Sequence, residues 1–332
     1  MISASPRPES SAGSRAAAHA PLVIAVLTYK RTADLAVALP RLLHQARTAP
    51  IPAQVLVIDN DPDAGARDVV EGRKDPALIY VHEPRPGIAA ARNRALKDAG
   101  TSSRLLAFID DDEVPSEHWL QQLAELQKRT GAAAVVGPVL SEYAVAPDPW
   151  IAAGEFFKRR RLETGSRITV AATNNLLLDL GQIRDLGLEF DERFGLSGGS
   201  DTLFTRQLVQ AGAVMLWCDE AVVVDRVPES RLTRAWVLRR AFRSGNCHSR
   251  VRLTMMSGRG PKFLARLQLV APGAARLGGG AAQALTGIVT GSLRLKAKGL
   301  RTAARGAGIL TGAVGYVFSE YKRSGHRHVF RA

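Results

Sequence analysis

Short apolar runs alternate with stretches of helical periodicity along the first half of the chain, and this alternation limits the possible folds. The runs comprise residues 22–27, 54–58, 78–81, 105–109 and 133–136. Runs of this length and composition are typical of buried strands. Between them, apolar residues recur at helical spacing, as at Leu35, Leu39 and Leu42. The pattern predicts an α/β fold with a mostly parallel, mixed sheet flanked on both faces by helices.

Polar side chains directly follow three of these runs. Thr28 follows the first, Asp59 follows the second, and Asp110 begins an acidic cluster after the fourth. Ligands of open α/β sheets bind beyond the carboxyl ends of the strands, so we expect these residues to converge on one crevice. The first run is followed by no GxGxxG turn, and the chain has no GxxxxGK motif. A dinucleotide-binding fold and a P-loop are therefore disfavoured.

The acidic cluster reads Asp110-Asp111-Asp112-Glu113 and comes directly after a buried strand. Like charges this close raise each other's pKa unless something neutralises them. Mg²⁺ or Mn²⁺ bound to carboxylate oxygens and to a substrate diphosphate is the usual solution. The cluster therefore predicts a metal-assisted site for a nucleotide diphosphate. An exposed acidic turn that caps the next helix is the alternative.

Two features of the middle of the chain suggest parts of the same site. Residues 141–164 contain prolines, aromatics and a basic run, which predicts a long loop over the site. Gly198-Gly199-Ser200-Asp201 precedes a stretch of helical periodicity. Glycines at this place let a ligand approach the helix N-terminus closely, with Asp201 in the first turn.

Composition narrows the class of protein further. Of the 332 residues, 46% are hydrophobic, which excludes general disorder. Cys218 and Cys247 are the only cysteines, so a disulfide framework and a structural zinc site are both disfavoured, and a reducing cytoplasm fits. Residues 1–20 hold Ser, Ala and Pro without the apolar core of a signal peptide, and we expect a disordered leader there.

Positive charge is concentrated in the last third of the chain. Residues 226–332 contain 21 Lys and Arg, whereas Glu229 and Glu320 are their only acidic residues. This excess predicts a polyanionic partner, either an anionic membrane surface or nucleic acid. Nucleic acid is the less favoured partner, because the basic region lacks interleaved aromatic residues for base stacking.

Two uncharged runs, residues 277–293 and 306–319, interrupt this basic region. They are too short and too rich in glycine for transmembrane spans. Flanked by Lys and Arg, they are predicted to lie in the interface of an anionic membrane, in peripheral or monotopic attachment to its cytoplasmic face.

Six segments in order along residues 21–246 together resemble the inverting family 2 glycosyltransferases of the GT-A fold, and particularly the bacterial succinoglycan-type exopolysaccharide members. The segments are VLTYKR (26–31), VLVIDND (55–61), EPRPGIAAARNRAL (83–96), FIDDDEVPSEHWL (108–120), FDERFGLSGGSDTLF (190–204) and VPESRLTRAWVLRRAFRSGN (227–246). The resemblance implies a GT-A domain over residues 21–232, followed by a basic helical, membrane-associating region over residues 233–332.

The resemblance also assigns roles in donor binding. It implies that Asp59 accepts a hydrogen bond from the nucleotide base, that the Thr28 loop lines the base and ribose, and that Arg92 faces the nucleotide. Asp110 and Asp112 match the outer positions of a DxD motif that holds a divalent cation on the diphosphate, and Asp111 lies between them in the donor site.

Catalysis is assigned in the same way. The resemblance implies that Asp201 is the general base that deprotonates the acceptor hydroxyl. In-line attack on the anomeric carbon then inverts its configuration. The basic segment with Arg239, Arg240 and Arg243 is expected to hold the leaving diphosphate, with a membrane-surface role as the alternative.

Two positions depart from the family pattern. Ser200 stands where relatives have a glutamate, and Asp225-Arg226 stands where relatives often have a metal-binding histidine. Arginine is no metal ligand, but Arg226 could face the diphosphate instead.

The expected activity is transfer of a hexose from a nucleotide sugar, most simply a UDP-sugar, to a lipid-linked or cell-surface glycan precursor in polysaccharide biosynthesis. The alternative is a non-catalytic, degenerate transferase domain that serves as a membrane- or nucleic-acid-tethered binding protein.

Overall fold

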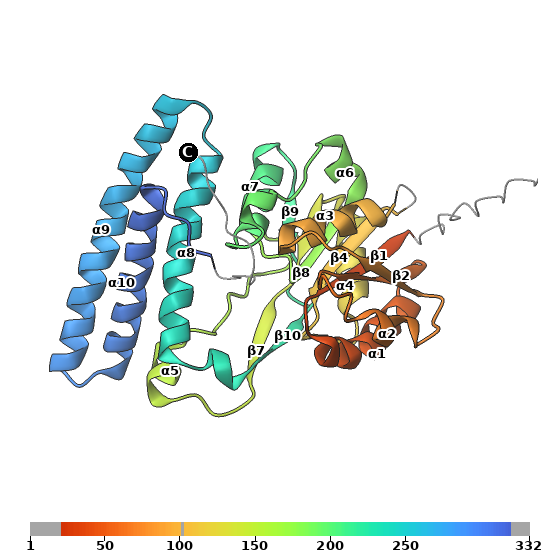
Figure 1. The fold of residues 1–332 in the computed structure, drawn as a ribbon, viewed down its shortest axis with the longest axis horizontal. Coiled ribbons are helices and arrows are strands. Elements are labelled where there is room, and N and C mark those ends of the chain that lie inside the picture. The colour runs from red at the N-terminus through yellow and green to blue at the C-terminus, as the bar shows by residue number, and fades with distance from the viewer. Residues whose placement is uncertain (1–20, 101–102, 320–332) are drawn as a thin grey trace, which may run out of the picture.

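The computed structural model describes residues 21–100 and 103–319, and the expected leader lies outside these residues. A central sheet of seven strands has the order β3-β2-β1-β4-β8-β6-β9 (Figure 1). Its strands are β1 (Leu22–Thr28), β2 (Ala53–Asp59), β3 (Leu78–His82), β4 (Leu105–Asp110), β6 (Ala134–Val136), β8 (Asn175–Asp179) and β9 (Met215–Trp217).

Strand β1 is the third strand in this order and pairs in parallel with β2 and with β4. The register places Thr28 opposite Asp59 on one side and Leu27 opposite Asp110 on the other. The polar residues that follow the strands therefore meet at one edge of the sheet, as the sequence predicts.

Strand β8 is the exception to the parallel arrangement, because it runs antiparallel between β4 and β6. A second sheet of three short strands has the order β5-β10-β7. It consists of β5 (Glu113–Pro115), β7 (Val139–Tyr143) and β10 (Val223–Val227). This small sheet continues from the acidic cluster, since β5 begins at Glu113.

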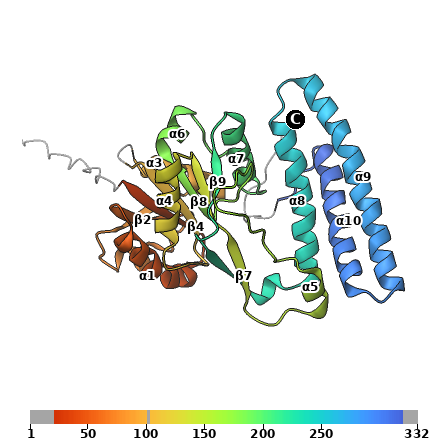
Figure 2. The ribbon, with the colours of Figure 1, turned by 180° about the vertical axis from the view of Figure 1, so that it is seen from behind.

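Helices cover both faces of the central sheet because side chains along each strand point alternately to opposite faces. Leu22, Ile24 and Val26 pack on one face, with helices α1 (Thr32–Thr48), α2 (Arg67–Glu71) and α4 (Trp119–Thr130). Val23 and Ala25 point to the other face, where α3 (Ile88–Asp98), α6 (Leu180–Asp185) and α7 (Ser200–Gln210) lie (Figure 2). Both faces are thereby buried.

Three short helical segments complete this part of the chain: α5 (Pro149–Gly154), η1 (Glu192–Phe194) and η2 (Glu229–Arg231). Helix α5 and the last residues of strand β7 lie within residues 141–164, which the sequence predicts as one long loop. The basic run of this segment, residues 158–161, has no helix or strand.

The C-terminal part folds into α8 (Arg234–Thr254), α9 (Arg259–Val289) and α10 (Leu293–Ala313), a layer beside the sheet domain (Figure 1). Helix α10 packs against both α8 and α9. Glycines allow this close approach: a Cβ on Gly245 of α8 would lie 2.1 Å from the Arg305 carbonyl oxygen, and one on Gly280 of α9 would lie 2.4 Å from the Ala303 nitrogen.

The packing of α10 buries part of one of the two uncharged runs of the C-terminal region. The buried residues are Gly306, Gly308, Ile309, Gly312 and Ala313. Residues 306–313 therefore face neighbouring helices rather than an external surface. Within the described ranges, none of the helices has the length and hydropathy needed to cross a bilayer.

We predict opposite effects for two glycines of α9. Gly280→Ala should lower the free energy of unfolding by about 1–3 kcal/mol, because the added methyl group meets the backbone of α10. Gly278→Ala meets nothing within 4 Å and should raise stability by about 0.5–1 kcal/mol through helix propensity. Urea unfolding of both variants tests this, and equal effects would contradict the packing explanation.

Candidate active site

A cleft of about 850 Å³ opens at the carboxyl ends of β1 and β4. Its lining combines the acidic cluster, the N-terminus of α7 with Asp201, the strand β10 and the facing side of α8. Among the predicted site residues, Thr28, Arg92, Asp110, Asp111, Asp112, Asp201 and Arg243 line it. Residues distant in sequence thus meet in one cavity.

The aspartates of the cluster have different partners. Thr28 donates a hydrogen bond from Oγ1 to Asp111 at 2.8 Å, so Asp111 is buried against β1. Asp112 is paired with two guanidinium groups, at 2.6 Å from Arg31 and 3.2 Å from Arg231. Arg31 also lies 3.3 Å from Asp111, so Asp112 is distinguished by its pairing with two guanidinium groups.

Burial raises the pKa of Asp110 to about 6 and that of Asp111 to about 7. The neighbouring Asp112 carboxylate adds to both shifts, whereas Arg31 opposes both. Burial, reinforced by Asp110, also raises the pKa of Glu113, which accepts a hydrogen bond from Asn174 at 2.6 Å. The cluster thus holds more negative charge than its surroundings stabilise, as its sequence suggested.

Asp225 of β10 joins the cluster and was not predicted. The side chains of β10 alternate, so Asp225 is buried and lines the cleft whereas Arg226 is exposed. Its Oδ2 lies 3.3 Å from Arg159, and its Oδ1 is buried and accepts no hydrogen bond from the described residues. The expectation that Arg226 faces the diphosphate thus has no support in this geometry, because the Asp225 carboxylate and not Arg226 lines the cleft.

Asp201 is held at the start of α7 by the two glycines before it. Gly198 and Gly199 have φ angles of +78° and +96°, a region that other residues adopt only with strain. A Cβ on Gly198 would lie 3.3 Å from the guanidinium carbon of Arg243, so the glycine also makes room for that arginine. Sequence and structure agree that this turn presents Asp201 to the cleft.

Ser200, the first departure from the family pattern, lies beside Asp201 and is fully buried. Arg92 of α3 donates a hydrogen bond to its Oγ at 2.7 Å. A hydroxyl accepts this bond without neutralising the guanidinium, so the charge of Arg92 remains directed at the cleft. It acts on Asp110, whose pKa it lowers against the effects of burial and Asp112.

Asp59 does not line the cleft. It is fully buried and accepts hydrogen bonds from the Asp61 and Ala66 backbone nitrogens and from the Tyr80 hydroxyl. The residue of this loop that reaches the cleft is Asn60. The expected contact of Asp59 with a base thus has no support in this geometry, where the carboxylate instead holds the loop after β2.

The C-terminal helices contribute more lining residues to the cleft than the sequence predicted. Arg240 and Arg243 of α8 line it, whereas Arg239 does not. Arg301 and Arg305 of α10 also line it, although their distance from every motif gave no signal in the sequence. The cleft therefore spans both sides of the expected boundary at residue 232.

Comparison with known proteins agrees with this geometry. The sequence model described as glycosyl transferase family 2 matches residues 23–178. The chain is 37% identical over 231 residues to the succinoglycan biosynthesis protein ExoM of Rhizobium meliloti (strain 1021). The alignment covers 69% of this chain and 74% of that protein. It is 27% identical over 175 residues to glycosyltransferase AglE of Haloferax volcanii, with 51% and 55% of the two chains covered.

Among solved structures, the mannosyltransferase PcManGT from Pyrobaculum calidifontis, in complex with GDP-Man and Mn²⁺, superposes with a TM-score of 0.58. The match covers 90% of this chain and 88% of that one at 18% identity. The fold and the carboxylate cleft define a glycosyltransferase of the GT-A fold. Given the identity to ExoM, the chain belongs to glycosyl transferase family 2.

We predict that Asp111 makes stability fall as pH rises. Its raised pKa means that the folded chain keeps a proton between about pH 4 and 7 that the unfolded chain has lost. Without nucleotide or divalent cations, the free energy of unfolding should therefore decrease over this range, by at most about 1.4 kcal/mol per pH unit for this one proton. In Asp111→Asn the decrease should be smaller.

Urea unfolding at about pH 5 and about pH 7 measures the difference. Asp63→Asn is the matched control, because the side chain of Asp63 is 80% exposed. Identical pH dependence in wild type and Asp111→Asn would contradict the prediction.

Proposed function

We propose that this glycosyltransferase inverts the configuration of a hexose that it transfers from a UDP-sugar to a lipid-linked or cell-surface glycan precursor. The observation that carries the proposal is the position of Asp201, a carboxylate at the rim of α7, in the same cleft as Asp110 and Asp112. This arrangement would bring a general base and a site for the donor diphosphate within one cavity. The name of ExoM supports a role in exopolysaccharide biosynthesis.

A divalent cation, Mg²⁺ or Mn²⁺, fits the donor set of this cleft. Asp112 faces the cavity, and the buried Asp225 Oδ1 has no hydrogen bond from the described residues, although Arg231 lies 3.5 Å away. In the described ranges, no three Asp, Glu, His or Cys side chains are already arranged as ligands. Asp112 would hold the cation, with Asp110 and Asp225 nearby, and the cation would neutralise charge on the donor diphosphate.

Proton transfer falls to Asp201. Its carboxylate would take the proton of the acceptor hydroxyl as the oxygen forms a bond to the anomeric carbon. The bond from that carbon to the diphosphate oxygen breaks on the opposite face, and the diphosphate leaves with the electron pair. Arg243 of α8 and Arg231 of η2 line the cleft and would stabilise the departing charge.

Attachment to the cytoplasmic face of a membrane is the second part of the proposal. Eight large apolar side chains of α9 are exposed: Phe263, Leu264, Leu267, Val270, Leu277, Leu285, Ile288 and Val289. At 100° per residue they lie on one face, together with alanines and glycines and, at one edge, Arg259. At a rise of 1.5 Å per residue, this apolar face is roughly 40 Å long from Phe263 to Val289.

The charge of the surrounding helices favours an anionic membrane as the occupant of this face. Helices α8, α9 and α10 contain no Asp or Glu, and the exposed Arg259, Lys262 and Arg266 lie on α9 itself. A second copy of such a surface would be repelled, whereas an anionic bilayer would be attracted. An apolar face beside basic residues, on a helix unsuited to crossing a bilayer, fits a helix lying in the membrane interface.

We predict that Asp201→Asn separates binding from turnover. With Mn²⁺ present, the variant should bind UDP within about twofold of wild type by calorimetry, and more tightly than GDP or dTDP. Its release of UDP from UDP-hexoses, with alkyl glycosides as acceptors, should fall about 10²–10⁴-fold, the usual contribution of a general base.

Asp185→Asn, an exposed carboxylate on α6, is the control and should leave both measurements unchanged. Failure of the wild type to bind UDP, GDP or dTDP would overturn the transferase proposal and favour the non-catalytic alternative. Tighter binding of GDP would overturn only the choice of UDP.

We predict that Leu267→Ser combined with Ile288→Ser weakens binding to phosphatidylglycerol vesicles at least tenfold in a flotation assay. Each side chain is more than half exposed, so the loss reflects apolar area withdrawn from lipid rather than from the core. Val37→Ser, an equally exposed change on α1, is the control. Salt at about 0.5 M or phosphatidylcholine vesicles should also weaken binding. Unchanged binding, or a dimer that the double variant dissociates, would contradict the proposal.

A further inference from the structure

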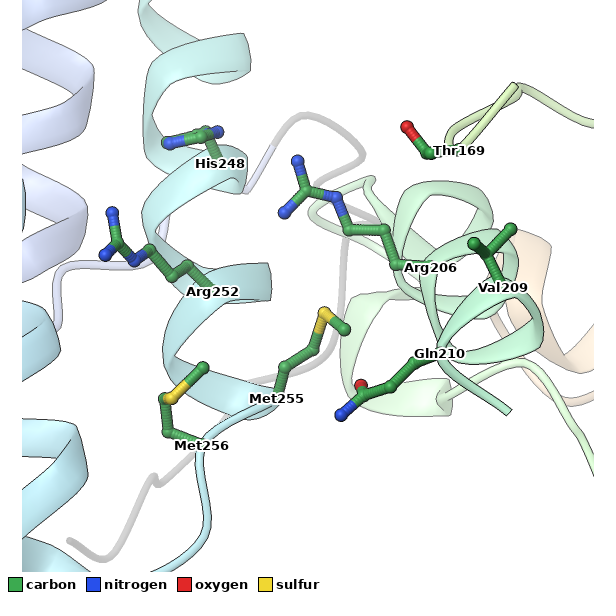
Figure 3. Close-up of a pocket in the computed structure, with 8 residues that line it drawn as sticks. All are labelled: Thr169, Arg206, Val209, Gln210, His248, Arg252, Met255 and Met256. Carbon is green, nitrogen blue, oxygen red and sulfur yellow. The ribbon is translucent and has the colours of Figure 1, made fainter. Parts of the chain in front are cut away.

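A second cavity, of about 500 Å³, lies between α7 and α8 (Figure 3). Arg206 and Val209 line it from α7, and His248 and Arg252 line it from α8. None of its lining residues also lines the cleft that holds Asp110 and Asp201. It is therefore a separate site, and neither the family motifs nor the proposed reaction uses its residues.

The lining of this cavity is cationic. Arg206 and Arg252 supply two guanidinium groups, and none of the described residues lining the cavity is an aspartate or a glutamate. Arg252 donates a hydrogen bond to the neutral Gln268 side chain of α9. Elsewhere arginines of this chain meet carboxylates, as Arg161 meets Asp219 at 2.7 Å. The charge in this cavity has no such compensation within the part of the chain that the structure describes.

The lowered pKa of His248 is consistent with these positive surroundings. Burial lowers its pKa, and Arg206, Arg305, Arg252 and Arg276 lower it further. The charged groups that lower this pKa come from α7, α8, α9 and α10 and are arginines. An anion in the cavity would be attracted by Arg206 and Arg252, because both are partly withdrawn from water.

The remaining lining is mostly apolar. Val209 lines the cavity from α7, and Met255 and Met256, at the end of α8, lie below the arginines in Figure 3. Methionine side chains adapt to irregular apolar ligands. The cavity therefore offers an anionic group the guanidinium of Arg206, with the charge of Arg252 nearby on the side of α8 that faces α9 (Figure 3). It also offers an apolar surface to a hydrocarbon chain attached to that group.

The position of the cavity connects it to catalysis. Arg206 and Asp201 are both on α7, five residues apart, which corresponds to about 7.5 Å along the helix axis. Figure 3 shows Arg206 extending from α7 toward α8. A molecule anchored in the cavity would lie along the helix that presents the catalytic base.

We propose that the cavity between α7 and α8 binds the diphosphate and the adjoining hydrocarbon of the lipid-linked acceptor. The inference rests on the proposed function, which supplies such an acceptor, and it adds the site that holds the acceptor's anionic end. Arg206 binds the diphosphate and Arg252 adds positive charge beside it, whereas Val209, Met255 and Met256 contact the first part of the lipid.

Calorimetric titration with farnesyl diphosphate tests this proposal. The protein is first saturated with UDP and Mn²⁺, which fills the donor cleft and leaves only a second site for the probe. We expect farnesyl diphosphate to bind once per chain and at least tenfold more tightly than inorganic pyrophosphate or farnesol. Arg206→Gln combined with Arg252→Gln should weaken its binding at least tenfold.

Arg266→Gln is the matched control, because this arginine is exposed on α9 and lines neither cavity. The double variant must bind UDP as wild type does, which shows that it is folded. Absence of farnesyl diphosphate binding, or binding that the double variant leaves unchanged, would overturn the proposal. Equal affinity for pyrophosphate would overturn the lipid assignment in favour of free phosphate. Failure of the first step, UDP binding, would overturn the proposed function instead.

Discussion

Negative charge buried at the end of β4 is the constraint on which the rest of the site depends. Asp110, Asp111 and Glu113 lie in surroundings that oppose their ionisation. Guanidinium groups reach them from separate elements, including Arg31 before α1 and Arg92 on α3. Because each arginine is fixed to its own element, this charge pairing sets how the loops, the small sheet and the helices meet around the cleft.

The α/β class of the fold was predictable from the sequence because continuous apolar runs leave few alternatives. Asp110, Asp112 and Asp201 line the cleft, as expected from the motifs of unusual composition that contain them. The small sheet was missed because β5 has only three residues, and β7 and β10 only five each, too few for a clear periodicity. Because this sheet was missed, Arg226 was expected to face the cleft. Only the pairing of β10 shows that Asp225 points inward instead.

Long-range contacts explain the other differences. Asp59 looked like a ligand residue because it ends a strand, but its burial follows from Tyr80 on the neighbouring strand β3. Arg301 and Arg305 reach the cleft only because glycines bring α10 against α8. Neither arrangement has a local signature. In both cases, residues far apart in sequence decide what a side chain contacts.

The sharing of one cleft between the sheet domain and the C-terminal helices has a consequence for how chains of this kind can diverge. A domain that contains all residues of its site can be joined to new domains without changing that site. Here, replacement of the helical layer would remove Arg243 and Arg305 from the cleft. Exchange of that layer between relatives would alter the cleft together with the exposed apolar face of α9. We therefore expect the two parts to be inherited as one unit, with changes in α8 or α10 matched by changes around Gly198.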